Sequence, residues 1–396
     1  MAKKKGHTVI DLFAGCGGLS LGLYKAGRNG LFAIEKNPFA FETLKANLIN
    51  KKKHFNWPKW LPQTPHDINE VLENYKIELK GLRGKVDLVA GGPPCQGFSM
   101  AGKRVEEDIR NNLVFSYIKF IDLVRPKIIL FENVKGFTYA FDKKKNEEAI
   151  PYSQKVIDGL KMLGYNVKSN IIDFSKFGIP QRRNRFILIG IQKSLGSPDQ
   201  FEEMLESRKN KFLKSKGLTA STTLKEAISD LLQSNGEIPT PDRKGFKSGI
   251  YGAEESYYQK LLRTDYAETH NIPDSHSFAK HSSEKLECFK KLLRIDGDER
   301  KKWNIKQRSI TILDADSISP TITGHPDDYL HYCEPRIMTV RECARIQSFP
   351  DWYEIKEKYT TGGEMRKIEV PRYTQVGNAI PPLFAELAGI VLKKLI

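Results

Sequence analysis

The chain of 396 residues is long enough for one large domain with a smaller partner, or for two comparable domains. It has no apolar run of membrane-spanning length and no apolar signal core at its start, so we expect a soluble, cytoplasmic protein with no membrane partner. Its net charge of +16 favours a polyanionic partner, above all nucleic acid, although many basic proteins bind none. The five cysteines are odd in number and widely spaced, which argues against a disulfide framework and a zinc site and leaves at least one thiol free to react.

Strand-like and helix-like segments alternate through the first half of the chain. This alternation is typical of an α/β fold with a doubly wound, mostly parallel sheet. The apolar runs predict strands at residues 8–13, 31–34, 86–90, 127–131, 165–174 and 185–191, with helices among them at residues 38–48 and 113–123.

The rhythm stops at about residue 192. From there to about residue 335 the sequence is mixed and polar, which predicts a second, smaller and irregular domain. Basic and acidic side chains balance over residues 191–330, so the positive surplus belongs to the rest of the chain.

A glycine-rich turn follows the first predicted strand in "DLFAGCGGLSLGL" (11–23). In an open α/β sheet, ligands bind beyond the carboxyl ends of the strands. Glu35 ends the second strand at the spacing expected of an acid that binds ribose hydroxyls. Ser20 replaces the third glycine of the dinucleotide fingerprint, which favours a nucleoside ligand such as S-adenosylmethionine. Such turns are also often purely structural.

The third predicted strand is followed by the loop "GGPPCQGFS" (91–99). The two prolines stiffen this loop, and its glycines let the backbone approach a ligand closely. Cys95 is therefore held at a strand end, where a thiolate with a lowered pKa would be a nucleophile. A buried cysteine is, however, more often a small core residue.

Two further polar groups lie at strand ends. Glu132 in "FENVKG" (131–136) is a possible acid or hydrogen-bond partner, or else a helix cap. The motif "QRRNRF" (181–186) brings three arginines to the start of another strand, where they could also be surface charge. The ordered occurrence of all three features favours a shared site.

In its motifs the chain resembles the C5-cytosine DNA methyltransferases, which use S-adenosylmethionine. The resemblance covers nearly the whole chain outside residues 192–320. It rests on motifs that occur in the family's order: "DLFAGCGGLSLGL", "AIEKNPFAFETL", "HDI", "GGPPCQGFSMAGKR", "FENVKGF", "FGIPQRRNRFILIG", "RECARIQSFPD" and "QVGNAIPPLFAELAG".

The resemblance implies catalytic roles for four residues. Cys95 looks like the nucleophile that adds to C6 of the target cytosine. Glu132 looks like the carboxyl group that contacts N3 and the exocyclic amine. Arg183 and Arg185 match the arginines that support this site.

The resemblance also implies a cofactor site for S-adenosylmethionine. Glu35 would bind the ribose, and Asp67 with Ile68 would read the adenine. Lys36 stands where some relatives have an aromatic residue stacked on the adenine. The full expected set is Phe13, Ala14, Gly15, Cys16, Gly17, Gly18, Leu19, Glu35, Lys36, Asp67, Ile68, Pro94, Asn378 and Ala379.

Double-stranded DNA is the partner that the resemblance implies. A stacked base must be flipped out before a thiol can attack its face. Ser99, Lys103 and Arg104, just after the nucleophile, are expected to contact DNA, and "SPTITG" (319–324) resembles the end of the family's recognition domains.

The implied organisation has three segments. Residues 1–191 form the catalytic and cofactor-binding domain, residues 192–350 the target-recognition domain, and residues 351–396 a hinge and return segment that completes the catalytic domain. The histidines at 270, 276 and 281 with Cys288 invite a metal-site interpretation, but their irregular spacing favours hydrogen-bonding roles, and we expect no metal.

We therefore expect a monomeric bacterial DNA (cytosine-5-)-methyltransferase, associated with the nucleoid through DNA and acting beside a cognate restriction endonuclease in a restriction-modification system. Two alternatives stay open. One keeps the chemistry and methylates transfer RNA, and the other is an inactive DNA-binding regulatory module, against which the presence of Cys95, Glu132 and Arg185 argues.

Overall fold

The computed structural model describes most of the chain, namely residues 7–94, 112–140, 150–264, 266, 272–295, 298–300, 302 and 310–395. It divides into two compact units. The first unit comprises Met1–Asp173, Asn184–Lys209 and Phe384–Ile396, and the second comprises Phe174–Arg183 and Asn210–Leu383.

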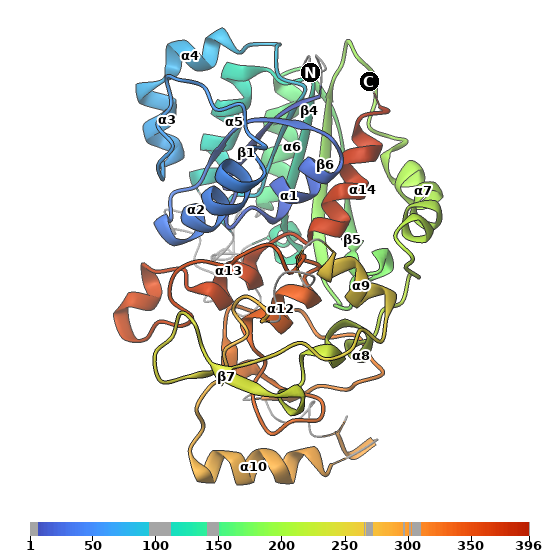
Figure 1. Ribbon diagram of the computed structural model, residues 1–396. Helices are drawn as coiled ribbons and strands as arrows, with labels where there is room; N and C mark the ends of the chain where they lie inside the picture. The colour runs from blue at the N-terminus through green and yellow to red at the C-terminus, as the bar shows by residue number, and fades with distance from the viewer. Residues whose placement is uncertain are drawn as a thin grey trace, which may run out of the picture. The chain divides into compact units, whose positions relative to one another are not determined.

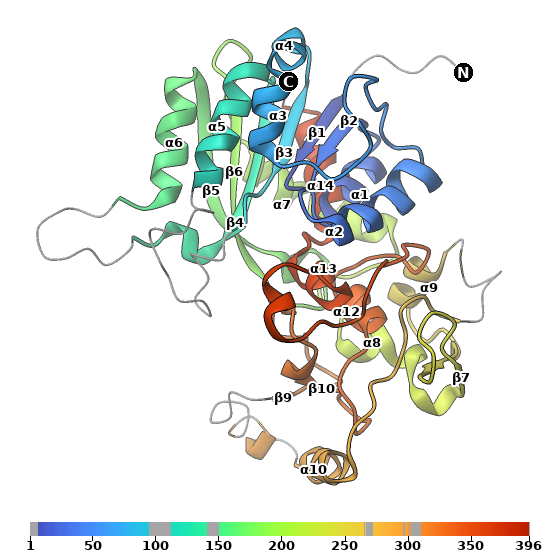
Figure 2. The ribbon, with the colours of Figure 1, turned by 90° about the vertical axis from the view of Figure 1, so that its left-hand side faces the viewer.

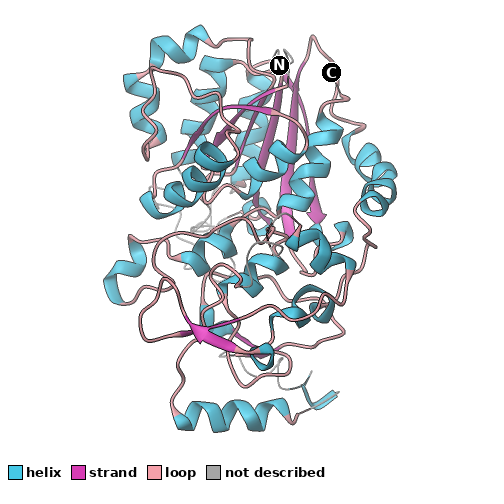
Figure 3. Cartoon of the chain, in the orientation of Figure 1, coloured by secondary structure: helices cyan, strands magenta, loops and turns pink. Residues whose placement is uncertain are grey.

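A six-stranded sheet forms the centre of the first unit (Figures 1 and 3). The strand order is β2-β1-β3-β4-β6-β5, and β6 alone runs against its two neighbours. The doubly wound, mostly parallel sheet is thus confirmed. Its strands are β1 (Thr8–Leu12), β2 (Asn29–Ile34), β3 (Leu88–Gly91), β4 (Ile128–Val134), β5 (Tyr165–Asp173) and β6 (Asn184–Gln192).

Helices cover both faces of this sheet, with α3, α5 and α6 on one face and α1 and α14 on the other (Figure 2). A π-helical turn, η1 (Lys45–Lys51), continues α2, so the helix predicted at 38–48 changes its hydrogen bonding midway. The helices are α1 (Gly18–Lys25), α2 (Pro38–Leu44), α3 (Ile68–Asn74), α4 (Lys76–Gly81), α5 (Leu113–Val124), α6 (Tyr152–Met162) and α14 (Pro382–Leu392), with the 3-10 turn η3 (Lys135–Thr138) after β4.

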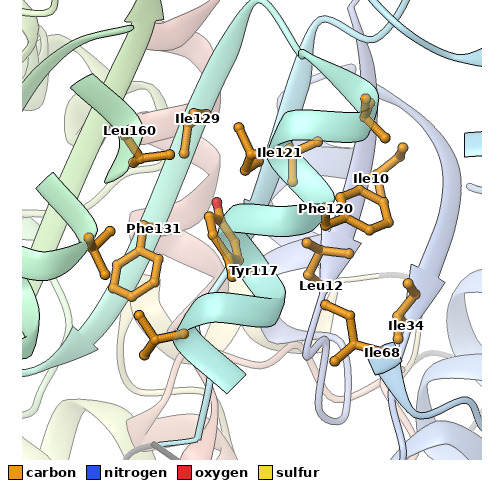
Figure 4. Packing of buried hydrophobic residues seen from close by; sticks show 14 of the residues in the cluster. Ile10, Leu12, Ile34, Ile68, Tyr117, Phe120, Ile121, Ile129, Phe131 and Leu160 are labelled. Carbon is orange, nitrogen blue, oxygen red and sulfur yellow. The ribbon is translucent and has the colours of Figure 1, made fainter. Parts of the chain in front are cut away.

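The core of the first unit lies between α5 and the strands (Figure 4). Tyr117, Phe120 and Ile121 recur at helical spacing and turn one face of α5 to the sheet, where Leu12 and Phe131 are fully buried. Burying each such side chain contributes about 1.5–3 kcal/mol, so this face fixes α5 on the sheet.

The second unit has short elements and two small two-stranded sheets, as the loss of periodicity predicts. Its elements are η4 (Phe174–Phe177), α8 (Leu224–Ile228), η5 (Ser229–Leu231), η6 (Gln233–Asn235), β7 (Glu237–Pro239), β8 (Lys247–Gly249), α9 (Tyr257–Arg263), α10 (Ser283–Leu293), β9 (Thr311–Ile312), η7 (Pro326–Asp328), β10 (Tyr329–Leu330), α12 (Val340–Ile346), η8 (Gly363–Lys367) and α13 (Arg372–Asn378); α7 (Phe201–Ser215) spans the boundary between the units.

Buried ion pairs hold the second unit around α12, whose seven residues are all buried. Arg345 donates to Asp230 at 2.6 Å and to Asp351 at 2.7 Å, and all three side chains are inaccessible to solvent. Because an unpaired buried charge is costly, these pairs fix the position of the irregular segments that carry the two acids.

The compact units divide the chain at other residues than the predicted three segments. Residues 192–209 belong to the first unit, whereas Phe174–Arg183 and residues 351–383 belong to the second. Periodicity reports which segments are regular, but it carries no information about which segments pack together across long sequence separations.

Among the described residues one helical stretch, Arg372–Leu392, is long and apolar enough to cross a membrane by length and composition alone. Of its apolar 18-residue window, 83% is buried inside the structure. The stretch includes α13 and α14, and this burial is what a core segment of a water-soluble protein shows.

Candidate active site

The glycine turn after β1 is built on left-handed backbone. Phe13 has φ +56°, Gly15 has φ +56° and Gly17, the N-cap of α1, has φ +91°. Holding a residue other than glycine there costs about 1–2 kcal/mol, so the turn at Phe13 is strained. Ala14 N–H donates to the carbonyl of Ile34 at 3.0 Å and ties the turn to the end of β2.

Glu35 follows β2 directly, and its side chain is hydrogen-bonded to the glycine turn. Its carboxylate accepts the N–H of Gly15 at 2.8 Å and the N–H of Asn37 at 2.7 Å. Burial raises the pKa of Glu35, and these N–H groups partly oppose that rise. Each oxygen keeps a second lone pair, so the carboxylate can also accept hydrogen bonds from a diol.

Asp67 and Lys36 form an ion pair of 2.8 Å beside Glu35. Asp67 also caps α3 by accepting the N–H of Asn69 at 2.8 Å. Burial raises the pKa of Asp67, but these two partners outweigh it and lower the pKa overall. Ile68 has a buried side chain, so it can offer a ligand only its main-chain N–H, which is unpaired within the first turn of a helix.

These residues fit a nucleoside ligand. Apart from Gly15 and the residues on either side of it, no heavy atom of the described residues lies within 4 Å of the position that a Cβ would take on Gly15, so this face of the turn is open. Phe13, Gly15 and Glu35 are partly exposed and can contact a ligand. The other expected residues of the turn are buried and support its backbone; these are Ala14, Cys16, Gly17, Gly18 and Leu19.

Three expected cofactor residues belong to other segments of the chain. Pro94 is exposed at the end of the described part of the loop after β3. Asn378 ends α13 and is exposed, whereas the adjacent Ala379 is buried, and both belong to the second unit.

Glu132 and Arg185 meet on one face of the sheet. Arg185 Nε lies 3.0 Å from Glu132 Oε1, with the side chains 11% and 15% exposed. Glu132 pairs with Ile187 and Arg185 with Val134, so the two are diagonal neighbours on β4 and β6. Glu132 lies within β4, two residues from its end, rather than at a strand end as predicted, because the pairing of β4 with β6 continues beyond its pairing with β3.

The loop after β3 packs directly on Glu132. A Cβ on Gly92 would lie 2.5 Å from the carbonyl oxygen of Glu132 and 2.8 Å from Oε2, so only glycine fits there. Asn133, which the sequence analysis did not single out, is buried and donates through Nδ2 to the carbonyl of Pro93 at 3.2 Å. A buried amide needs a partner, and this one fixes the backbone two residues before Cys95.

Asp11 is a second residue that the sequence analysis left unassigned. Burial raises the pKa of Asp11 to about 7, although the Ser20 hydroxyl donates to its carboxylate. Burial likewise raises the pKa of the Cys16 thiol to about 12, so Cys16 is a neutral, buried packing residue of the turn. An acid at the end of a buried strand was the available signal for Asp11.

Several expected residues lie outside the described residues: Cys95, Ser99, Lys103, Arg104 and His270. Arg183 belongs to the second unit, whereas Glu132 and Arg185 belong to the first. The Arg183 guanidinium is buried and donates to the main-chain carbonyls of Ile322, Gly377 and Ala379.

The histidine cluster has hydrogen-bonding roles where it is described. His276 is buried between the Thr339 hydroxyl at 2.8 Å and the Leu231 carbonyl at 2.9 Å, while Cys288 is exposed on α10. Among the described residues, no group of three His, Cys, Asp or Glu side chains is placed to hold a metal ion.

Comparisons with known proteins identify the family of the chain. Residues 7–394 match the family model described as C-5 cytosine-specific DNA methylase. The chain is 31% identical over 393 residues to the type II methyltransferase M1.HphI of Haemophilus parahaemolyticus, covering 98% of this chain and 87% of that one. It is 29% identical over 396 residues to the type II methyltransferase M.DdeI of Desulfomicrobium norvegicum, covering 96% and 86%.

Solved structures share the fold. A prophage-encoded protein of E. coli assigned as a DNA modification methyltransferase superposes with a TM-score of 0.70 at 23% identity, covering 98% of this chain and 99% of that one. The Dnmt2 methyltransferase of S. pombe superposes with a TM-score of 0.54 at 17% identity, covering 98% of each chain.

Proposed function

The chain belongs to the C-5 cytosine-specific DNA methylase family, and from this we propose which of its residues carry the transfer of a methyl group to cytosine in DNA and what that transfer serves. S-adenosylmethionine, the family's cofactor, supplies an electrophilic methyl group when bound. The observation that carries the proposal is the Glu132–Arg185 pair on the sheet beside the loop that leads into Cys95.

The proposed cofactor residues bind different parts of S-adenosylmethionine. Glu35 accepts hydrogen bonds from the ribose hydroxyls, since both its oxygens are already oriented by main-chain N–H groups. Asp67 accepts from the exocyclic amine of the adenine, and the N–H of Ile68 donates to the ring. Lys36 fixes Asp67 instead of stacking on the base. Asn378 and Ala379 are assigned to the cofactor by their motif alone.

Glu132 and Arg185 act on the flipped cytosine. The carboxyl group of Glu132, when protonated, donates to N3 and accepts from the exocyclic amine, and so draws electron density from C6. Arg185 holds that carboxyl group by a charge-assisted hydrogen bond in a largely dry site, where such bonds are strong. The ring is thereby prepared for attack at C6.

Cys95 supplies the nucleophile. Its thiolate forms a bond to C6, and the electron pair moves to C5. C5 would then bond to the methyl carbon of the cofactor, whose methyl–sulfur bond would break and leave the thioether S-adenosylhomocysteine. A base then removes the C5 proton, the C5–C6 double bond forms again, and the C6–S bond breaks to release the thiolate. Ser99, Lys103 and Arg104 follow in the same loop and contact DNA, which this step requires because the target base must leave the stack.

The relatives of about 30% identity are type II methyltransferases, which supports a place in a restriction-modification system. We therefore propose that this enzyme works in the cytoplasm as a monomer, on host DNA, and protects the sites of a cognate restriction endonuclease.

The test is base-resolution mapping of methylcytosine in DNA from a methylation-free bacterial host that expresses the protein. Cys95→Ala is the matched control. We expect methylcytosine confined to one short motif with the wild type, and none with the variant. Methylcytosine in RNA alone, or equal methylation by the variant, would contradict the proposal.

A second experiment isolates the covalent step. A duplex with 5-fluorocytosine at the mapped position should trap the wild type in a denaturation-resistant adduct, because fluorine cannot leave as a proton does. Peptide mass spectrometry should place the adduct on Cys95, and an adduct on another residue would refute the assignment.

A further inference from the structure

Three side chains form a buried polar cluster in the second unit: Gln181, Arg183 and Gln347, exposed by 0%, 1% and 0%. Gln181 Nε2 donates to Gln347 Oε1 at 2.9 Å, and Arg183 Nη1 donates to Gln181 Oε1 at 3.4 Å. We call these three residues the buried cluster.

One side of the buried cluster holds the turn at residues 321–324, the "TITG" of the motif assigned to recognition. The N–H of Ile322 donates to Gln181 Oε1 at 2.9 Å, and Arg183 Nη1 donates to the carbonyl of Ile322 at 3.4 Å. Thr321 adds a bond from its hydroxyl to the carbonyl of Arg182 at 2.6 Å. The turn is therefore fixed on both sides of Ile322.

The other side of the buried cluster holds the end of α13. Arg183 Nη2 donates to the carbonyls of Gly377 and Ala379 at 3.0 and 3.1 Å. Gln347 Nε2 donates to the carbonyl of Val376 at 2.9 Å. The last carbonyls of a helix have no partner within the helix, and here two side chains of the cluster supply one.

The turn and the helix end also touch directly. A Cβ on Gly377 would lie 2.3 Å from the carbonyl oxygen of Thr323, and the Thr374 hydroxyl donates to the carbonyl of Gly324 at 3.2 Å. A shift of either segment alone would separate buried donors from buried acceptors, which is unfavourable. The contacts therefore hold the two segments in one fixed arrangement.

We propose that the buried cluster is a positioning device that couples recognition of the target sequence by the turn at 321–324 to binding of the cofactor by Asn378. Arg183 is then a positioning residue that never touches the cytosine, which replaces the catalytic role expected from its motif. The inference rests on the proposed function, because that function assigns the turn to DNA and Asn378 to the cofactor.

The test measures the coupling itself. The dissociation constant of S-adenosylhomocysteine is determined with and without a duplex carrying the mapped motif, and that of the duplex with and without S-adenosylhomocysteine. By thermodynamic linkage both pairs give the same factor, which we expect to lie between about 5 and 150 in the wild type. A wild-type factor of 1, in an enzyme that methylates its motif, would overturn the inference and leave the proposed function standing.

Two variants separate coupling from local contact. Gln181→Leu removes the contact to the turn, and Gln347→Leu removes the contact to α13. We expect a crossed effect: Gln181→Leu weakens cofactor binding as well, Gln347→Leu weakens DNA binding as well, and both bring the coupling factor towards 1. Arg183→Lys, which keeps the charge but loses the two-carbonyl fork, should weaken both ligands together.

Arg345→Lys is the control for general destabilisation. Arg345 is equally buried in the same unit, but its partners are Asp230, Asp351 and the carbonyl of Ala227. It should lower the melting temperature and keep the wild-type coupling factor. If Gln181→Leu and Gln347→Leu behave in the same way, or each weakens only its own ligand, the buried cluster is structural only. A wild type that methylates no DNA would instead refute the proposed function.

Discussion

Arg185 on β6 and Glu132 on β4 share a charge-assisted hydrogen bond of 3.0 Å in a largely dry part of the sheet. The antiparallel β6 makes this contact possible, because it brings the start of one strand alongside the end of the other. Glu132→Gln keeps the shape of the side chain and removes its charge. We expect the single-turnover rate of methylation to fall by about 10²–10⁴-fold, as when an acid–base group is lost.

Glu73→Gln is the matched control, since Glu73 is an exposed glutamate on α3 of the same unit. Its rate should equal that of the wild type. Duplex binding by Glu132→Gln should change much less than its rate, and an unaltered rate would exclude Glu132 from the chemistry.

Gly92 has no room for a side chain, because a Cβ would lie 2.5 Å from the Glu132 carbonyl oxygen. Gly92→Ala should lower the free energy of unfolding by about 1–3 kcal/mol and displace Glu132. Thermal unfolding and methylation rate report the two effects. Gly81→Ala lies at the end of α4, where no described atom outside the helix backbone and the adjacent residues comes within 4 Å of the added Cβ. It should raise the free energy of unfolding by about 0.5–1 kcal/mol and leave the rate unchanged.

Substitution of Asn133 tests whether the reaction of Cys95 requires the backbone before it to be fixed. Asn133→Ala leaves the Pro93 carbonyl buried without its donor, which should cost about 1–3 kcal/mol of stability. The rate of covalent trapping by the 5-fluorocytosine duplex should fall as well. A variant with lower stability and a normal trapping rate would show that Asn133 serves the fold alone.

The buried His276 should make the stability of the second unit sensitive to acid. Burial lowers its pKa to about 4, while the unfolded chain keeps the ordinary value of 6.5. Between these values the unfolded state binds more protons, so the free energy of unfolding should fall as the pH drops from 6.5 to 4, by up to about 3 kcal/mol from this residue. Urea unfolding across this range measures the slope, which His276→Gln should reduce. His325→Gln, at an exposed histidine, should leave it unchanged.

The cysteines should differ in reactivity. Burial raises the pKa of Cys16 to about 12 and that of Cys343 higher still, whereas Cys288 is exposed on α10. Iodoacetamide at pH 8 should therefore modify Cys288 in the folded protein and spare Cys16 and Cys343, as peptide mass spectrometry can show. In denaturant all of them should react, and early labelling of Cys16 in the native protein would contradict the packing described for it.

The local features of this protein could be predicted from its sequence, because they depend on residues that are close to one another along the chain. Alternating apolar runs predicted the six strands of the first unit, and the spacing of Gly15 and Glu35 predicted an acid beside the glycine turn. The structure shows that acid accepting the N–H of Gly15 at 2.8 Å. The loss of rhythm after residue 192 likewise predicted a region of short elements, and family motifs indicated the methyltransferase chemistry.

Tertiary structure alone decided the long-range relationships. No pattern along the chain indicates that Gln181 contacts Gln347, 166 residues away, or that Arg345 is buried between Asp230 and Asp351. Arginines in "QRRNRF" look alike in the sequence, yet Arg185 pairs with a carboxylate on the sheet while Arg183 binds main-chain carbonyls in the second unit. The reason is physical: a buried charge takes whichever partners the folded chain brings within hydrogen-bonding distance, and no local pattern specifies those partners.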